Sequence, residues 1–200
     1  MEVKDLAEAL KRKGYQVSVF KTKEDAADYI AGLFDGDIIG FGDSLTMTQM
    51  DLYNRLSEKN IVKDPNQYSG KRFLAAAKEA LTADYFFTSV NAITKDGVII
   101  NIDCTGNRIA GSLFGHKKVF YIFGTNKITE DIESGVFRVR NVAAPLNAKR
   151  LNYKTPCAVK GDKCYDCNSP ARICRGLLIQ YRAMDDTESE AIIIEEELGI

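Results

Sequence analysis

The sequence contains one histidine, His116, and this scarcity limits the chemistry that the chain can perform. A metal centre built from several histidines is excluded, and a Ser-His-Asp triad would have to use this residue. Because His116 lies between Gly115 and Lys117 at the start of an apolar segment, we expect it to be a solvent-facing turn residue. No catalytic role is therefore assigned to it.

Several other absences bear on location and partners. No segment approaches the roughly 18 consecutive apolar residues that a membrane span needs. The opening stretch MEVKDLAEALKRKG lacks the apolar core of a secretory signal, so we expect a cytoplasmic protein without a membrane partner. The 27 basic and 28 acidic residues give a net charge of −1, which offers no bulk positive field for a phosphate backbone. Nucleic acid is not an expected partner.

The charge is unevenly distributed along the chain. Residues 185–200 hold seven acidic residues and no basic one, so residues 1–184, with 27 basic against 21 acidic residues, carry +6. Such a body suits a small anionic ligand. We expect the acidic tail to form a strand anchored by residues 192–194, with its charges facing water.

Short apolar runs alternate with amphipathic stretches, which predicts an α/β domain with helices on both faces of a mixed, mostly parallel sheet. Without a repeat, a linker or a low-complexity tract, residues 1–200 are expected to form a single domain. The expected strands are 15–20, 37–42, 84–90, two short strands within 91–103, 117–124, 176–182 and 190–196. The expected helices are the opening stretch up to Gly14, then 23–34, 45–57, 71–83 and 129–150.

A glycine-containing loop, GFGDSLT at residues 40–46, follows one of the buried strands. In open α/β sheets ligands bind beyond the carboxyl ends of strands, where backbone N–H groups and the next helix favour an anion. Gly40, Gly42, Ser44 and Thr46 are therefore candidate ligand-binding residues. The loop matches neither G-x-G-x-x-G nor a Walker loop, and a tight turn followed by a helix N-cap explains it equally well.

A second polar run, DCTGNR at residues 103–108, also follows an apolar strand. Gly106 permits close backbone approach, Asn107 can donate and accept hydrogen bonds, and Arg108 offers a planar fork for a carboxylate or phosphate. The alternative is a polar corner in which Arg108 pairs with Asp103. Lys127, at the end of a later strand, is either a cation for the ligand or an ordinary loop lysine.

Four of the five cysteines, Cys157, Cys164, Cys167 and Cys174, lie within 18 residues, spaced C-x6-C-x2-C-x6-C. This segment, 157–174, can supply four thiolates to one zinc ion or iron–sulfur cluster, and interleaved lysines and arginines would favour thiolates. Ser169 and Pro170 predict an N-cap and first turn that place Cys174 on a short helix. The spacing matches neither bacterial ferredoxins nor zinc ribbons, so reduced or disulfide-forming thiols remain the alternative.

Five motifs in order resemble the LUD domain, a lactate-utilisation family once classed as a domain of unknown function. They are GFGDSLT at 40–46, NAITKDG at 91–97, DCTGNR at 103–108, FGTNKI at 123–128 and APLNAKR at 144–150. The resemblance covers about residues 10–200. The cysteine segment is similar to that of the short, single-domain branch of the family.

The resemblance implies a three-layer α/β/α sandwich like that of ribose-5-phosphate isomerase and the CoA transferases. It implies a role in lactate or related organic-acid metabolism, with a small anionic metabolite as ligand and iron–sulfur or flavin proteins as partners. The chain itself has no flavin or nicotinamide fingerprint. The expected ligand-binding residues are Gly40, Gly42, Ser44, Thr46, Asn91, Thr105, Gly106, Asn107, Arg108 and Lys127.

Other functions remain open at this point. One is a stand-alone isomerase or transferase acting on a sugar phosphate or CoA thioester, with Asp103 as the catalytic base. Another is a non-catalytic subunit, and self-association into a homo-oligomer is compatible with each of these functions. Whether the chain is an enzyme is not decided by its sequence.

Overall fold

The computed structural model describes residues 3–200, and its central feature is a six-stranded sheet in the order β1-β10-β7-β4-β2-β3. All neighbouring strands in this sheet run parallel. The strands are β1 (Gln16–Phe20), β2 (Ile38–Phe41), β3 (Ile61–Lys63), β4 (Tyr85–Thr88), β7 (Lys118–Gly124) and β10 (Glu188–Ile194). Because parallel strands are joined by crossovers, helices come to lie on both faces of the sheet.

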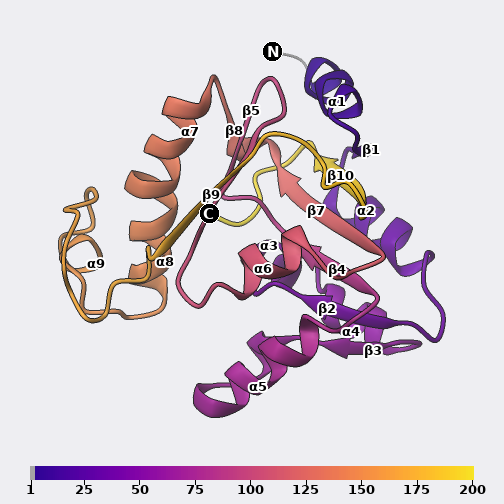
Figure 1. The fold of residues 1–200 in the computed structure, drawn as a ribbon, viewed down its shortest axis with the longest axis horizontal. Coiled ribbons are helices and arrows are strands. Elements are labelled where there is room, and N and C mark those ends of the chain that lie inside the picture. Colours follow the sequence, from indigo (N-terminus) through magenta and orange to yellow (C-terminus); the bar gives the residue numbers. More distant parts are fainter. Residues whose placement is uncertain (1–2) are drawn as a thin grey trace.

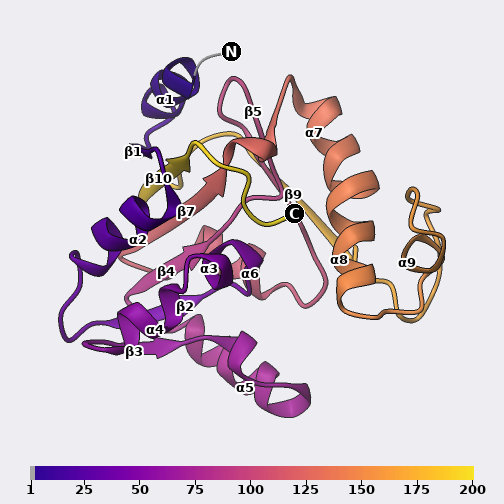
Figure 2. The same ribbon diagram turned by 180° about the vertical axis from the view of Figure 1, so that it is seen from behind.

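Side chains of β7 alternate between two hydrophobic cores, one on each face of the sheet. Phe120 and Ile122 pack in the core formed with α2, α3 and α4, whereas Val119 and Tyr121 pack in the core formed with α1 and α5. Figures 1 and 2 show these helices around the sheet from opposite sides. The helices are α1 (Val3–Arg12), α2 (Lys23–Ala31), α3 (Leu45–Gln49), α4 (Leu52–Ser57), α5 (Gly70–Ala80) and α6 (Asn107–Leu113). The predicted three-layer α/β/α sandwich is confirmed.

A second sheet of four strands, in the order β8-β5-β6-β9, lies beside the first. It comprises β5 (Ala92–Thr94), β6 (Ile99–Asp103), β8 (Ile128–Thr129) and β9 (Gly176–Gln180). A helical column of α7 (Ile132–Arg138), a π-helical turn (Val139–Ala143) and α8 (Ala144–Arg150) packs on this sheet through Ala92, Ile100 and Val139. Figure 1 shows the column in orange, with α9 (Pro156–Lys160) on its outer side.

Several local signals produce the expected structure. Thr22 caps α2 by accepting a hydrogen bond from the backbone N–H of Asp25 at 3.1 Å. Gly14 follows α1 with φ +90° and Gly97 forms the β5–β6 turn with φ +83°, values that side chains other than glycine rarely adopt.

Three expected helices differ from the structure. The helix expected over 45–57 breaks at Asp51, whose φ of +54° separates α3 from α4. The one expected from 129 begins at Ile132 and contains the π-helical turn. The short helix expected to hold Cys174 is absent, because residues 161–175 form neither helix nor strand. Strand β3 was not expected, since its three residues carry too little pattern.

The prediction that His116 faces solvent is wrong. Its side chain is 4% exposed and stacks on Phe86 with ring centroids 4.8 Å apart. The ring nitrogen Nδ1 lies 2.7 Å from the carbonyl oxygen of Ala83, whereas Nε2 is buried without a hydrogen-bond partner among the described residues. His116 is therefore part of the protein interior.

The acidic tail also departs from its expected environment at one position. Strand β10 lies between β1 and β7, inside the sheet, and Glu190 on it is 2% exposed. Its carboxylate pairs with the Lys118 ammonium at 2.7 Å and accepts hydrogen bonds from the Ser18 and Tyr29 hydroxyls. A buried carboxylate is stable only with such partners.

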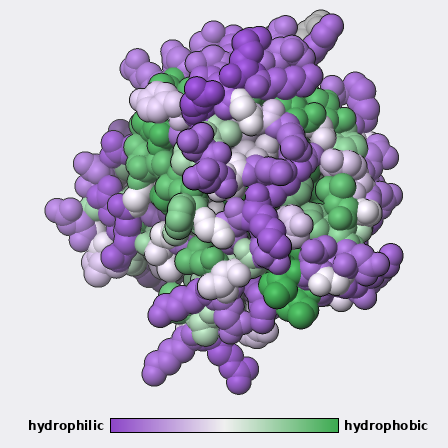
Figure 3. Space-filling model, turned by 45° about the vertical axis from the view of Figure 1, so that its right-hand side comes forward, coloured by the Kyte–Doolittle hydropathy of each residue, from purple (hydrophilic) through white to green (hydrophobic). Residues whose placement is uncertain are grey.

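Hydrophilic residues dominate the surface in the view of Figure 3, where apolar residues form separate areas. Within residues 3–200, none of the helices has both the length and the apolar character that crossing a membrane requires.

Candidate functional site

The site begins where three neighbouring parallel strands end. β2, β4 and β7 are adjacent in the sheet, so the residues that follow them meet at one edge. Ser44 follows β2, Ser89 follows β4, and Lys127 follows β7 in a single 3₁₀ turn. Two motifs more than eighty residues apart are thereby brought together, as the hydrogen bond between Lys127 and Thr46 records.

Lys127 is the buried cation of the site, with 3% of the residue exposed. Its Nζ donates to the Ser89 hydroxyl at 2.9 Å and to the Thr46 hydroxyl at 3.1 Å. Among the ion pairs of the described residues, none involves Lys127. Burial, reinforced by the positive charges of Arg108 and Arg138, lowers the pKa of Lys127 to about 7. Near neutral pH its amine therefore exists both with and without the proton.

Arg108 ties the two polar runs together. Its Nε donates to the carbonyl oxygen of Gly42 at 3.2 Å, and its Nη2 donates to the carbonyl oxygen of Asp43. Asp43 has a φ of +53°, an uncommon conformation for a residue other than glycine, and such strain is concentrated at functional sites. Burial raises the pKa of Asp43, although Arg108 and Arg150 oppose the shift.

Two adjoining cavities make up the space at this edge of the sheet. A small polar cavity of about 50 Å³ is lined by Ser44, Thr46, Ser89 and Lys127, and a cleft of about 650 Å³ lies next to it. The two cavities share six lining residues: Asp43, Asn91, Arg108, Ala143, Asn147 and Arg150. Within the helical column, the π-helical turn and α8 thus supply part of the wall of both cavities.

Most expected ligand-binding residues line this space. Ser44, Thr46 and Lys127 line the small cavity. Thr105 and Asn107 line the cleft. Asn91 and Arg108 line both. Ser44 starts α3 without a capping hydrogen bond from its hydroxyl. These residues come from four separate sequence motifs.

The three expected glycines do not line either cavity. A Cβ atom on Gly40 would lie 2.3 Å from the carbonyl oxygen of Ala80, so this glycine allows α5 to pack closely on β2. One on Gly42 would lie 3.0 Å from the ring of Phe86. Gly106 has a φ of +89° and starts α6. Their visible roles are in packing and backbone conformation.

Asp103, the expected catalytic base, holds the start of α6. One carboxylate oxygen accepts from the backbone N–H groups of Cys104 and Thr105, and the other accepts from those of Arg108 and Ile109. These four hydrogen bonds occupy the roughly four lone-pair positions of a carboxylate. The Asp103 side chain thus shapes the loop that carries Arg108. The sequence offered a pairing of Arg108 with Asp103 as an alternative, and in the structure Asp103 accepts from the backbone N–H of Arg108, not from its guanidinium.

Sequence reasoning missed four residues at the site. Ser89 was expected inside a strand and Arg138 inside a helix, whereas Asn147 and Arg150 stand in the APLNAKR motif but were not chosen as site residues. Arg138 donates to the carbonyl oxygens of Asn91 at 2.6 Å and Asn126 at 3.2 Å, which joins α7 to two of the loops. The available signal was the polar residues of APLNAKR, which recur on one side of α8.

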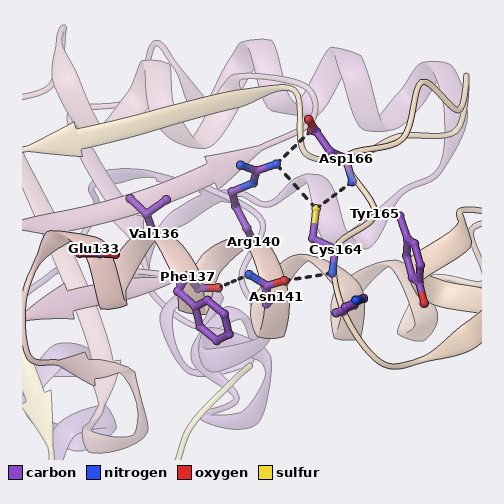
Figure 4. Close-up of a pocket in the computed structure, with 9 residues that line it drawn as sticks. Glu133, Val136, Phe137, Arg140, Asn141, Cys164, Tyr165 and Asp166 are labelled. Carbon is purple, nitrogen blue, oxygen red and sulfur yellow. Dashed lines mark hydrogen bonds and ion pairs between the residues drawn. The ribbon is translucent and has the colours of Figure 1, made fainter.

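The four clustered cysteines line neither cavity. Their segment begins at α9, on the outer side of the helical column, and reaches the cleft only at Ile173. Cys104, which is not part of that segment, also lines the cleft. All five cysteines are free, and within residues 3–200 no three His, Cys, Asp or Glu side chains gather as a metal-binding group. In Figure 4 the Cys164 thiol faces the Arg140 guanidinium at 3.9 Å and the backbone N–H of Asp166 at 3.3 Å. The four thiols as placed do not form a ligand set, so the iron–sulfur or zinc site stays a prediction.

Comparison with known proteins identifies the chain. No curated protein matches its sequence significantly. Its fold is similar to the crystal structure of a DUF162 family protein from Deinococcus radiodurans, with a TM-score of 0.50 and 14% identity over 96% of this chain and 95% of that chain. The family model of the LUD domain matches residues 3–194. The chain belongs to the LUD domain family.

Proposed function

We propose that the protein binds a small organic carboxylate, of the 2-hydroxy or 2-oxo acid class, in the cavity at the ends of β2, β4 and β7. The observation that carries the proposal is Lys127, a buried amine with two hydroxyl partners and no acidic one within the described residues. A buried ammonium without a counter-charge is costly, and a bound anion would supply that charge.

The charges and donors around the cavity support an anionic ligand. Arg108 and Arg150 line it, and Arg138 lies close enough to lower the pKa of Lys127. Ser44 and Thr46 add hydroxyl donors, and Asn147 adds an amide. The positive charge of residues 1–184, noted in the sequence, thus includes arginines and a lysine that line this cavity.

The size of the cavity favours a small ligand. The polar part beside Lys127 has a volume of about 50 Å³, enough for a few heavy atoms such as a carboxylate and the oxygen on the adjacent carbon. The cleft of about 650 Å³ next to it would hold the rest of a longer acid. Lactate and pyruvate, the acids of the metabolism to which the LUD family is linked, are of the smaller kind.

Acid–base chemistry at this site would use Asp43 and Lys127. Burial raises the pKa of the Asp43 carboxyl and lowers that of the Lys127 amine, so their pKa values approach each other. The Lys127 amine, with a pKa of about 7, can exchange a proton with a ligand near neutral pH. Asp103 is less suited, because four backbone N–H groups occupy its carboxylate.

A thermal-shift and calorimetry panel tests the proposal. L-lactate, pyruvate and oxalate are compared with ribose 5-phosphate and coenzyme A, using the wild type, Ser44→Ala with Arg108→Ala, and Arg12→Ala as a control on the exposed face of α1. We expect carboxylate binding that the double substitution removes and the control keeps. Unchanged affinity in the double variant would place the site elsewhere, and binding of ribose 5-phosphate or coenzyme A alone would favour an isomerase or transferase.

Iron–sulfur or flavin proteins remain the proposed partners, since the chain has no flavin or nicotinamide fingerprint of its own. Co-purification under anaerobic conditions tests this part. Recovery of such proteins with the wild type supports a subunit of a redox complex, and a chain that binds carboxylates but recovers none would act alone.

A further inference from the structure

The surroundings of the Lys127 amine suit a nucleophile as well as a cation. The group is buried, hydrogen-bonded to two hydroxyls and close to two arginines, whereas the other lysines of the described chain are exposed or ion-paired. Lysines that form covalent bonds to carbonyl compounds are desolvated or lie next to other cations, because both conditions favour the unprotonated amine. Lys127 meets both conditions.

We propose that Lys127 condenses with the carbonyl carbon of a 2-oxo acid and holds it as an imine. This inference rests on the proposed function, which places the acid's carboxylate in the same cavity. The carbonyl carbon of a 2-oxo acid is bonded directly to the carboxylate, so binding the carboxylate near Arg108 presents that carbon to a neighbouring amine.

The step is balanced without a redox partner. The Lys127 nitrogen attacks the carbonyl carbon, a C–N bond forms, and the carbonyl electron pair moves to oxygen. One proton passes from nitrogen to that oxygen, and a second proton, supplied by the Asp43 carboxyl, converts the hydroxyl into water. The C–O bond then breaks, water leaves, and the nitrogen lone pair completes a protonated C=N bond.

The neighbouring groups suit this sequence of proton transfers. Ser89 and Thr46 lie 3.2 Å apart and both contact the Lys127 nitrogen, so their hydroxyls can pass a proton across it. Asp43 lines the same cavity, and burial raises its pKa, which favours the protonated carboxyl. Asp43 and Thr46 follow β2, Ser89 follows β4, and Lys127 follows β7.

The cavity is open to a small acid but closely covered. Gly199 lies over the amine, and a Cβ atom there would come within 2.8 Å of Nζ and 2.5 Å of the Thr46 hydroxyl. The bare backbone of Gly199 therefore leaves the space that a side chain would fill. Such cover would exclude water from the imine and slow its hydrolysis.

Reductive trapping tests the inference. The full-length protein is incubated with pyruvate and sodium cyanoborohydride, and its peptides are mapped by mass spectrometry. We expect one site, Lys127, to gain the mass of pyruvic acid less one oxygen atom. Lys127→Arg should abolish the modification, and Lys149→Arg, at an exposed lysine of α8, should leave it unchanged.

Thermal shifts with L-lactate and oxalate, which lack a ketone, separate the two proposals. If these acids bind but pyruvate is not trapped, or is trapped evenly across surface lysines, the imine is refuted while carboxylate binding stands. If neither acid binds and nothing is trapped at Lys127, both proposals fail.

Discussion

The Nζ atom of Lys127 donates a hydrogen bond to the Ser89 hydroxyl at 2.9 Å, although the two residues are 38 positions apart. The contact exists because β4 and β7 are parallel neighbours, so the residue after each strand reaches the same edge of the sheet. Of these two residues, the sequence indicated Lys127 as a candidate ligand-binding residue but not Ser89. The proposed function depends on the Lys127 amine being buried and held by this hydrogen bond.

Replacing Lys127 with methionine should change how stability depends on pH. Burial lowers its pKa from 10.5 to about 7, so between these values the unfolded chain binds more protons than the folded one, and wild-type stability rises with pH. The stability of Lys127→Met relative to wild type should therefore be greatest near pH 7 and decline toward pH 10. Urea denaturation at several pH values measures this difference, and parallel curves would contradict the burial of a charged amine.

Replacing Arg108 with lysine keeps the charge but removes the fork that holds the Gly42 and Asp43 carbonyl oxygens. We expect a loss of about 1–3 kcal/mol in the free energy of unfolding, together with weaker carboxylate binding. Arg12→Lys on α1 is the matched control. Wild-type stability and affinity in Arg108→Lys would show that the loop does not depend on the guanidinium.

Gly40→Ala tests whether this glycine serves packing. Its new Cβ atom would lie 2.3 Å from the Ala80 carbonyl oxygen, and such overpacking costs about 1–3 kcal/mol or more. Gly32→Ala is the control, because its Cβ would lie 3.5 Å from the nearest atom and its φ is −77°. Chemical denaturation compares the two variants. A Gly40→Ala protein as stable as wild type would refute close packing of α5 on β2.

His116 should make the protein less stable in mild acid. Burial lowers its pKa below 6.5, so as pH falls through 6.5 the unfolded chain binds a proton that the folded chain resists. The stabilising contribution of His116 is present above pH 6.5 and is lost as pH falls toward the folded pKa. We expect His116→Gln to be less stable than wild type at neutral pH, and the difference to shrink near pH 5. A constant difference across this range would contradict the assignment.

Metal analysis decides the role of the cysteine segment. The spacing predicts zinc, or iron with sulfide, bound by Cys157, Cys164, Cys167 and Cys174. Protein purified anaerobically should then contain about one zinc ion or one cluster per chain, and Cys→Ser substitutions at these positions should remove it. A preparation with neither metal would support reduced thiols, in agreement with their separate placement in the structure.

Much of the fold is encoded in local patterns. Apolar runs such as DIIGF and KVFYIF predicted strands buried on both faces, and β2 and β7 confirm them. The order of the strands was not accessible in the same way. β10 pairs between β1 and β7, and no local feature of an acidic segment indicates a central position. The burial of Glu190 could not be predicted either, because the partners of its carboxylate come from β1, α2 and β7, which are distant in the sequence.

The site was predicted where a motif combines glycine with polar residues at the end of a strand. Thr46, Arg108 and Lys127 stand in such motifs, and the structure brings them to one place. Ser89 was missed because it directly follows strand β4, three of whose four residues are aromatic. Arg150 was missed because it comes from a helix whose position depends on the second sheet. Residues that reach the site only through the tertiary fold, such as Ser89 and Arg150, could not be recognised from the sequence.

A crystal structure of the protein with oxalate, compared with a ligand-free crystal, tests most directly whether Lys127 binds an anion. We expect oxalate between Lys127 and Arg108, with an oxygen within hydrogen-bond distance of Lys127 Nζ. Oxalate bound at any other place, or none at a concentration that saturates a thermal shift, would contradict this expectation.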